Sequence, residues 1–363
     1  YRGLGLILLM VYFSWLAGDW SFFKGRWDVG NYLAIAQNGY EYHPCTAETK
    51  SECGTIGWFP GWPLLLAFFR LLGFDLNTVA KLLPSLLFLG GMVLTERWTR
   101  QLNLIPERKR FYLSFLVFYP LSFYFVTAFP YSLIFFLANL YLLVFYSDPN
   151  TPRFFKLGLI AFGISLTYPT GVLFLLIPFG YYSFQWMTSK RKTLSSKSSI
   201  ARSLWPYLQK SALCALPFIL GPLIYFIYLG VKFQNPMVYF EFQSHFNRTF
   251  GNPFTIIYGA LFHAPTTERN FLSWFLVILA LGIDRASLRR FPELSFYFFA
   301  AFLFSPATGT TEAIFRHSLL WFPLGILIAS NQRPRWIQFL ILLLSGIMMT
   351  AFFVPRFMNG LVI

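Results

Sequence analysis

The chain has 363 residues, of which 56% are hydrophobic and 21% aromatic. Only 12% carry a charge, about half the share of roughly 25% that is typical of soluble domains. Its mean hydropathy is +0.55. A soluble domain of this length could not hide so much apolar surface, so we expect a membrane protein. The net charge of +15 would suit a nucleic-acid-binding protein, but lysine and arginine also accumulate in the cytoplasmic loops of membrane proteins, and the composition favours that explanation.

Apolar runs near bilayer-spanning length recur from end to end, and each spanning helix needs about 20 such residues. The runs are rich in Leu and Phe and lack the two-residue alternation of barrel strands, so we expect helices. The predicted runs are 3–17, 64–73, 77–97, 111–127, 130–146, 155–168, 170–187, 211–230, 272–283, 291–305, 313–330 and 336–354.

The breaks between these runs are mainly basic, chiefly at 97–110, 190–210 and 284–290. Two topologies compete, and they differ in whether 60–73 crosses the membrane. If it does, the basic segments fall outside, against the positive-inside rule. This short stretch has two prolines at its start and is brief for a span. We therefore predict an all-α polytopic membrane protein with about 11 transmembrane helices, a single domain over 1–363, with its N-terminus inside and its C-terminus outside.

This topology defines two large extracytoplasmic loops, 18–76 and 231–271, and the first is expected to contain short interfacial helices. The stretch 190–210 is basic and Ser-rich, which predicts a solvated, mobile loop on the cytoplasmic side. Nearly all other residues that could take part in binding or catalysis lie in the outer segments.

The three cysteines divide into two kinds. Cys214 lies in an apolar run and is expected to be inert. Cys45 and Cys53 lie in the first outer loop, where an oxidising compartment would allow a disulfide, although spacing alone does not decide it. A zinc site is less favoured, because only His43 stands near as a third ligand. The acidic residues are scattered and form no Asp-x-Asp motif, so no cofactor or metal site is predicted, and a divalent metal is left open.

The densest group of polar and aromatic residues is 26–40 (Arg-Trp-Asp-Val-Gly-Asn-Tyr-Leu-Ala-Ile-Ala-Gln-Asn-Gly-Tyr). Residues 28–38 predict a short amphipathic helix, with Asp28 at its N-cap and Gly39 just beyond its end. Asp28 has two interpretations, a helix cap or a general base near the bilayer surface, where partial desolvation raises the pKa of a carboxylate. Composition alone does not choose between them.

An ordered set of residues resembles the PIG-V family, which attaches a mannose during glycosylphosphatidylinositol assembly. The family pattern is Trp-Asp, then Ile-Ala, Gly-Tyr and Phe-Pro-x-x-Pro. The matching residues are Trp27, Asp28, Tyr32, Ile35, Ala36, Gly39, Tyr40 and the segment 58–63 (Trp-Phe-Pro-Gly-Trp-Pro). Four later segments match in order: 130–136 (Pro-Tyr-Ser-Leu-Ile-Phe-Phe), 167–171 (Thr-Tyr-Pro-Thr-Gly), 234–240 (Gln-Asn-Pro-Met-Val-Tyr-Phe) with Gln243 and Arg248, and 315–323 (Phe-Arg-His-Ser-Leu-Leu-Trp-Phe-Pro).

The matches cover most of the chain, and three departures remove charges. Leu133 stands where the family has Glu, Tyr168 where it has Arg, and Gln234-Asn235 where it has Gly-Asp. A changed donor or acceptor specificity, or an inactive homologue, is left open.

The resemblance implies a GT-C-like glycosyltransferase, a bacterial homologue in the inner membrane with its active site facing the periplasm. The alternative is an endoplasmic reticulum protein with a lumenal site. Such enzymes move a sugar, here expected to be mannose, from a polyprenyl- or dolichyl-phosphate donor to a lipid-linked or glycan acceptor. In this hypothesis Asp28 is the catalytic base of an inverting displacement.

The resemblance also suggests a binding set. Arg316 would hold the donor phosphate, with His317 or Arg248, because an arginine fork suits a phosphodiester. The alternative interpretations are structural: Arg316 would be a snorkelling residue at the membrane interface, and His317 would make only a structural hydrogen bond. The expected substrate-binding residues are Trp27, Tyr32, Tyr131, Ser132, Tyr168, Gln243 and His245.

Two other classes stay open: a flippase or transporter of a lipid-linked saccharide, and a non-catalytic subunit of a glycosyltransferase complex. A transporter is less favoured, because the sequence shows no internal repeat and few charges deep within the apolar runs. No Gly-rich phosphate loop or nucleotide fold is visible, so a nucleotide-sugar donor is less favoured. The expected partners are the bilayer, the donor and the acceptor, with no nucleic acid.

Overall fold

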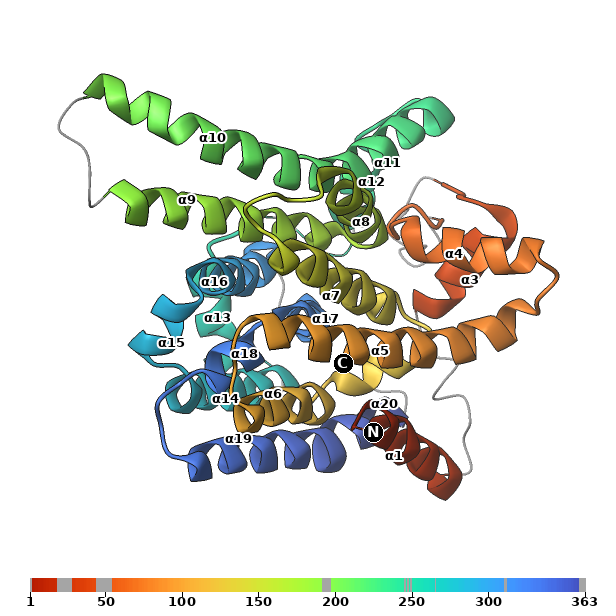
Figure 1. The fold of residues 1–363 in the computed structure, drawn as a ribbon. Helices are drawn as coiled ribbons and strands as arrows, with labels where there is room; N and C mark the ends of the chain where they lie inside the picture. Colours follow the sequence, from red (N-terminus) through yellow and green to blue (C-terminus); the bar gives the residue numbers. More distant parts are fainter. Residues whose placement is uncertain are drawn as a thin grey trace.

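The computed structural model describes residues 2–17, 28–43, 54–190, 197–244, 246, 248, 250–264, 266–309 and 312–358. Throughout these residues the chain forms helices joined by turns, with no β-strand (Figure 1). An isolated bridge pairs Tyr42 with Gly54. The predicted all-α class is confirmed.

The first half of the chain packs its longest helix, α5, along α7. Its elements are α1 (Arg2–Ala17), α3 (Asp28–Asn38), α4 (Gly61–Leu71), α5 (Leu76–Gln101), α6 (Pro106–Phe118), the 3₁₀ helix η1 (Ser122–Val126), α7 (Tyr131–Ser147), α8 (Phe154–Thr167), the 3₁₀ helix η2 (Pro169–Leu175) and α9 (Leu176–Lys190).

The second half packs back onto the first, with α11 along α8 and α16 along α9. Its elements are α10 (Lys197–Ala215), α11 (Pro217–Phe233), α12 (Val238–Ser244), α13 (Pro253–Phe262), α14 (Thr266–Gly282), α15 (Arg285–Arg290), α16 (Pro292–Ala307), α17 (Glu312–Ser318), the 3₁₀ turn η3 (Leu319–Trp321), α18 (Leu324–Ala329), α19 (Arg335–Ile347), the π-helical segment η4 (Met348–Phe353) and α20 (Val354–Met358).

Proline decides where many of these helices begin. In the described residues, five helices have proline as their first residue, where its missing N–H has no helical partner and its fixed φ suits the helix. These residues are Pro106, Pro169, Pro217, Pro253 and Pro292. Prolines thus cut the long apolar runs of the sequence into shorter helices.

In the part of the chain that the structure describes, two helices are long and apolar enough to cross a membrane, namely α5 and the continuous helix from Arg335 to Met358. A third candidate is the pair 203–215 and 217–233, which bends by 42° at its break. Several other apolar helices, such as α7 and α8, have only 17 and 14 residues. The number of spans is therefore smaller by helix length than the sequence predicts.

Three segments that the sequence predicts as loops contain helices. The stretch 190–210 was expected to be a loop, but α10 occupies it from Lys197 onward, so this prediction is wrong for that part. Trp186 on α9 donates a hydrogen bond to the Ser203 hydroxyl on α10 (3.3 Å), and the two helices pack side by side. The outer segment 231–271 contains the helices α12 and α13. The expected short helices of the first outer loop are α3 and α4.

The long helix α5 separates two ends of the molecule. Its first residue follows α4, and α3 packs on α4, so Asp28 belongs to this end. Its last residue leads into the basic segment 97–110. A helix of this length spans about 39 Å. Figure 1 shows α3 and α4 on the right, and α15 with the end of α9 and the start of α10 on the left. The basic segments and the Asp28 helix therefore lie at opposite ends.

A buried polar cluster ties α5 to α7. The Asn139 Oδ1 atom accepts hydrogen bonds from the Thr95 hydroxyl and the Trp98 indole N–H, both at 2.7 Å. The Asn139 amide donates to the Phe135 carbonyl at 2.7 Å. Thr95, Trp98 and Asn139 are all fully buried. Because a buried donor without a partner is costly, this cluster fixes how the two helices face each other.

Replacing Asn139 with leucine tests this cluster. The change leaves the Trp98 N–H buried without its acceptor, so we expect a loss of about 1–2 kcal/mol in the free energy of unfolding. Thr95→Val is the milder control, because Asn139 and Trp98 keep their mutual bond. Reversible denaturation in detergent micelles measures both, and equal stability of Asn139→Leu and wild type would contradict the assignment.

Candidate active site

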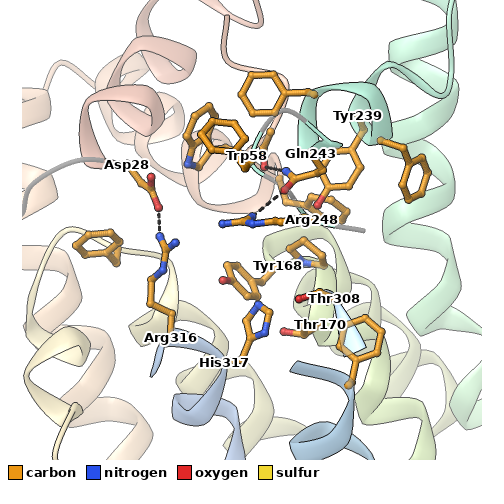
Figure 2. A pocket seen from close by; sticks show the side chains of 18 of the residues that line it. Asp28, Trp58, Tyr168, Thr170, Tyr239, Gln243, Arg248, Thr308, Arg316 and His317 are labelled. Atoms are coloured by element: carbon orange, nitrogen blue, oxygen red, sulfur yellow. Dashed lines mark hydrogen bonds and ion pairs between the residues drawn. The ribbon is translucent and has the colours of Figure 1, made fainter. Parts of the chain in front are cut away.

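One cavity of about 340 Å³ lies at the Asp28 end of the molecule. Its wall comes from α3, residues 57–59, the η1 region, η2, α12, the end of α16 and α17 (Figure 2). Segments from the beginning, middle and end of the chain therefore meet at a single cavity.

Asp28 and Arg316 join the first and last of these segments. Asp28 is the first residue of α3, and its carboxylate accepts a hydrogen bond from the Arg316 guanidinium on α17 in an ion pair. The two side chains are 25% and 21% exposed. Figure 2 shows the pair facing each other at one side of the cavity. At the first turn of a helix a carboxylate is also favoured by the helix dipole, so both interpretations of Asp28 fit its position.

Arg248 is held differently from Arg316. Its Nη1 donates to the Gln243 side-chain oxygen at 2.7 Å, and its guanidinium lies over the Phe246 ring at 5.9 Å. Its Nε is buried without a hydrogen-bond partner. In the described part of the chain no carboxylate pairs with Arg248. The cavity wall thus holds two arginines and one aspartate, and the positive charge of Arg248 is unmatched.

Gln243 links Arg248 to the part of the cavity wall formed by residues 57–59. It is buried on α12, and its amide donates to the Gly57 carbonyl at 3.5 Å, next to Trp58. The Trp58 and Phe242 rings meet edge-on at 5.6 Å. Because these contacts join α12 to the turn before α4, the position of Arg248 depends on the first outer loop.

His317 and Tyr168 form the third side of the cavity. His317 Nδ1 shares a hydrogen bond with the Ser305 hydroxyl at 3.0 Å. The Tyr168 ring lies edge-on to the His317 ring at 5.8 Å. The Tyr131 and Tyr168 hydroxyls are 3.3 Å apart, and Tyr131 stands behind Tyr168, away from the cavity wall. Tyr131 therefore positions Tyr168.

Tyr32 and Tyr239 are neutral hydrogen-bond donors in this site. Burial, with a contribution from the Asp28 charge, raises the pKa of Tyr32 well above its usual range. Burial likewise raises the pKa of Tyr239, and the nearby Arg248 charge opposes this in part. Both phenols stay protonated at neutral pH, so each can donate to an anionic or hydroxylated ligand.

The structure brings most of the predicted site residues to this cavity. Those that line it are Asp28, Tyr32, Tyr168, Gln243, Arg248, Arg316 and His317. Ser132 is buried off the cavity, and its hydroxyl has no hydrogen-bond partner. Trp27, Cys45, Cys53 and His245 lie outside the described residues, so the predicted disulfide and two of the predicted contacts stay predictions.

Sequence reasoning missed the aromatic side of the cavity. Tyr239 and Phe242 line it three residues apart on α12, and Phe246 follows four residues later, beyond the end of that helix. This spacing is readable in the sequence and could have revealed them. The lining residue Thr170 lies in η2 and Thr308 in the turn after α16, and the sequence gives no such signal for either.

Within the described residues, no three His, Cys, Asp or Glu side chains come together as a metal site. Models of known protein families and the curated proteins contain no match to this chain. The chemical interpretation therefore rests on the cavity itself. Its surplus positive charge favours an anionic ligand, its carboxylate can take a proton, and its aromatic wall suits a sugar ring or an apolar chain.

A double-mutant cycle on Asp28→Asn and Arg316→Gln tests the ion pair without reference to any activity. Because the side chains are in direct contact, we expect a coupling of about 1 kcal/mol in the free energy of unfolding. The cycle is measured by denaturation in detergent. Strict additivity of the two single changes would show that the pair does not form.

Proposed function

We propose that this chain is an integral-membrane glycosyltransferase of the GT-C type. It moves a sugar, mannose by the family resemblance, from a polyprenyl- or dolichyl-phosphate donor to a hydroxyl of a lipid-linked or glycan acceptor on the extracytoplasmic side. The observation that carries the proposal is the joint position of Asp28, Arg316 and Arg248 around one cavity, at the end opposite the basic segments.

The side chains support an inverting displacement. Asp28 accepts the proton of the acceptor hydroxyl as that oxygen bonds to the anomeric carbon. The bond between the anomeric carbon and the phosphate oxygen breaks, and the phosphate leaves with the electron pair. Arg248 carries the unmatched charge and holds the phosphate. Arg316 links proton transfer to the departure of the phosphate. It binds Asp28 before the reaction, and it can stabilise the negative charge that develops beside it.

The cavity rim supports a lipid-linked donor over a soluble one. Three lining phenylalanines are exposed, Phe240 by 46%, Phe246 by 37% and Phe250 by 79%. Exposed aromatics continue on α13 at four-residue intervals, at Phe254, Tyr258 and Phe262. An apolar path leading away from a charged cavity suits an isoprenoid chain with a phosphate at its end.

A polytopic arrangement is part of the proposal. About 11 spans follow from the apolar runs, whereas two or three follow from single helices. We propose that short elements that follow one another in the chain, such as α6 and η1 or α17, η3 and α18, together make up the difference. The proposed location is a bacterial inner membrane with the site facing the periplasm, or alternatively the endoplasmic reticulum with a lumenal site.

The decisive test replaces Asp28 with asparagine, which keeps the size of the side chain and removes the base. In proteoliposomes with radiolabelled polyprenyl-phosphate mannose and a glycolipid acceptor, we expect sugar transfer to fall by about 10²- to 10⁴-fold. Asp75→Asn is the matched control, because that exposed carboxylate caps α5 in the same predicted outer loop.

Three outcomes discriminate the classes. Transfer that is undiminished in Asp28→Asn removes the base assignment. Movement of the labelled lipid across the bilayer without a new glycosidic bond indicates a flippase. Transfer that appears only when another protein is added indicates a subunit of a complex.

The aromatic rim gives a separate prediction. Phe250→Ser removes an exposed ring from the proposed lipid path, so we expect KM for the polyprenyl donor to rise roughly fivefold to tenfold with kcat unchanged. Phe339→Ser is the control, because Phe339 is also exposed but lies on α19, away from the cavity. A short-chain donor should be insensitive to Phe250→Ser, and equal KM changes for long and short donors would contradict the path.

A further inference from the structure

Three segments that are far apart in the sequence meet at the end of the molecule opposite Asp28. They are 96–110, 284–290 and 330–335. Arg290 donates to the Asn103 carbonyl at 3.3 Å, and Arg108 donates to the Ser330 carbonyl at 3.4 Å. The Gln332 N–H donates to the Asp284 carboxylate at 2.9 Å. We call the surface that these three segments form the basic face.

The basic face collects the carboxyl ends of three helices, α5, α14 and α18. Their last carbonyls lack helical partners, and the helix dipoles favour cations there. Arg108 and Arg290 meet carbonyls just beyond α18 and α5, and Arg333 approaches the Ile283 carbonyl beyond α14 at 3.5 Å. These three arginines hold the face together.

Other arginines of the basic face make no such contact with a helix end. The three segments contain ten Lys and Arg residues against three Asp and Glu residues, a net charge of +7. Arg285, Arg289 and Arg335 are exposed, and within the described residues their side chains make no hydrogen bond or ion pair. Asp284, the acid of α15, is occupied by the Ser287 and Gln332 N–H groups, and these bonds with the Arg333 charge lower its pKa despite partial burial. It therefore stays ionised and bound at neutral pH and does not neutralise these arginines.

The arginines begin where exposed apolar helix faces end. On α19, Trp336, Phe339 and Leu343 are exposed by 63%, 67% and 47% along one face, directly after Arg335. On α5, Leu86 and Val93 are exposed by 65% and 52% and are followed by the exposed Arg97 and Arg100. Two helices thus change from apolar to cationic at the same level, as expected at the border between lipid chains and headgroups.

We infer that the basic face binds the headgroups of anionic phospholipids. Exposed guanidinium groups donate to the phosphodiester oxygens, while Trp336 and its apolar neighbours contact the adjoining chains. The inference rests on the proposed membrane location and not on sugar transfer. The occupant is a lipid rather than a free phosphate, because the cations adjoin exposed apolar side chains.

The experiment uses the full chain purified in a neutral detergent and titrated with phosphatidylglycerol, with bound lipid counted by native mass spectrometry. The test variant is Arg285→Gln/Arg289→Gln/Arg335→Gln, which spares the three arginines that hold the face together. The control variant is Lys81→Gln/Arg153→Gln/Lys156→Gln, which removes the same charge from exposed positions elsewhere. Unchanged thermal unfolding verifies that both variants are folded.

We expect phosphatidylglycerol affinity to fall on the order of tenfold to a hundredfold in the test variant and to stay at the wild-type level in the control. Equal affinity in all three proteins overturns the inference, as does equal binding of phosphatidylcholine. Displacement of the lipid by millimolar inorganic phosphate would show a free-phosphate site instead. Because lipid counting involves no sugar transfer, a failure here is distinct from a failure of the glycosyltransferase proposal.

Discussion

The ion pair between Asp28 and Arg316 is the contact on which the candidate site depends. It joins the first residue of α3 to α17, 288 positions later. Charged residues are few in this chain, and an isolated carboxylate beside an aromatic wall would carry a desolvation cost. With Arg316 beside it, the carboxylate has an opposite charge in direct contact at a cavity only partly open to water. The pair therefore joins the two ends of the chain around the cavity.

The pair also explains why the site needs a second arginine. A cation already bound to a carboxylate offers less attraction to an incoming phosphate. Arg248 is oriented by a neutral partner, Gln243, and keeps its full charge. In the proposed mechanism the two arginines, which have different partners, divide two tasks: Arg316 organises the base and Arg248 receives the anion. The aromatic residues around them lower the local dielectric and strengthen both interactions.

The helical class could be predicted from the sequence, because long apolar runs leave a chain in lipid few other structures. The helix ends could not, since prolines such as Pro120 and Pro217 break the runs 111–127 and 211–230, which hydropathy shows as continuous. α10 was missed because its basic and Ser-rich composition hid the apolar side chains that pack on α9. In the site, motif order indicated Asp28, Arg248 and Arg316. It could not show that Ser132 lies behind the wall, because a motif does not reveal which helix face meets the cavity.

Arginines lie at both ends of this molecule, and they differ in the groups that they contact. At the cavity, Arg248 and Arg316 are each held by one side chain, Gln243 and Asp28, and not by a backbone carbonyl. On the basic face, Arg108, Arg290 and Arg333 contact backbone carbonyls at helix ends, which no ligand needs to displace. Backbone contacts make a fixed frame, whereas side-chain contacts leave the charge available. This difference agrees with the two proposals, which place the chemistry at the Asp28 end and lipid binding at the opposite end.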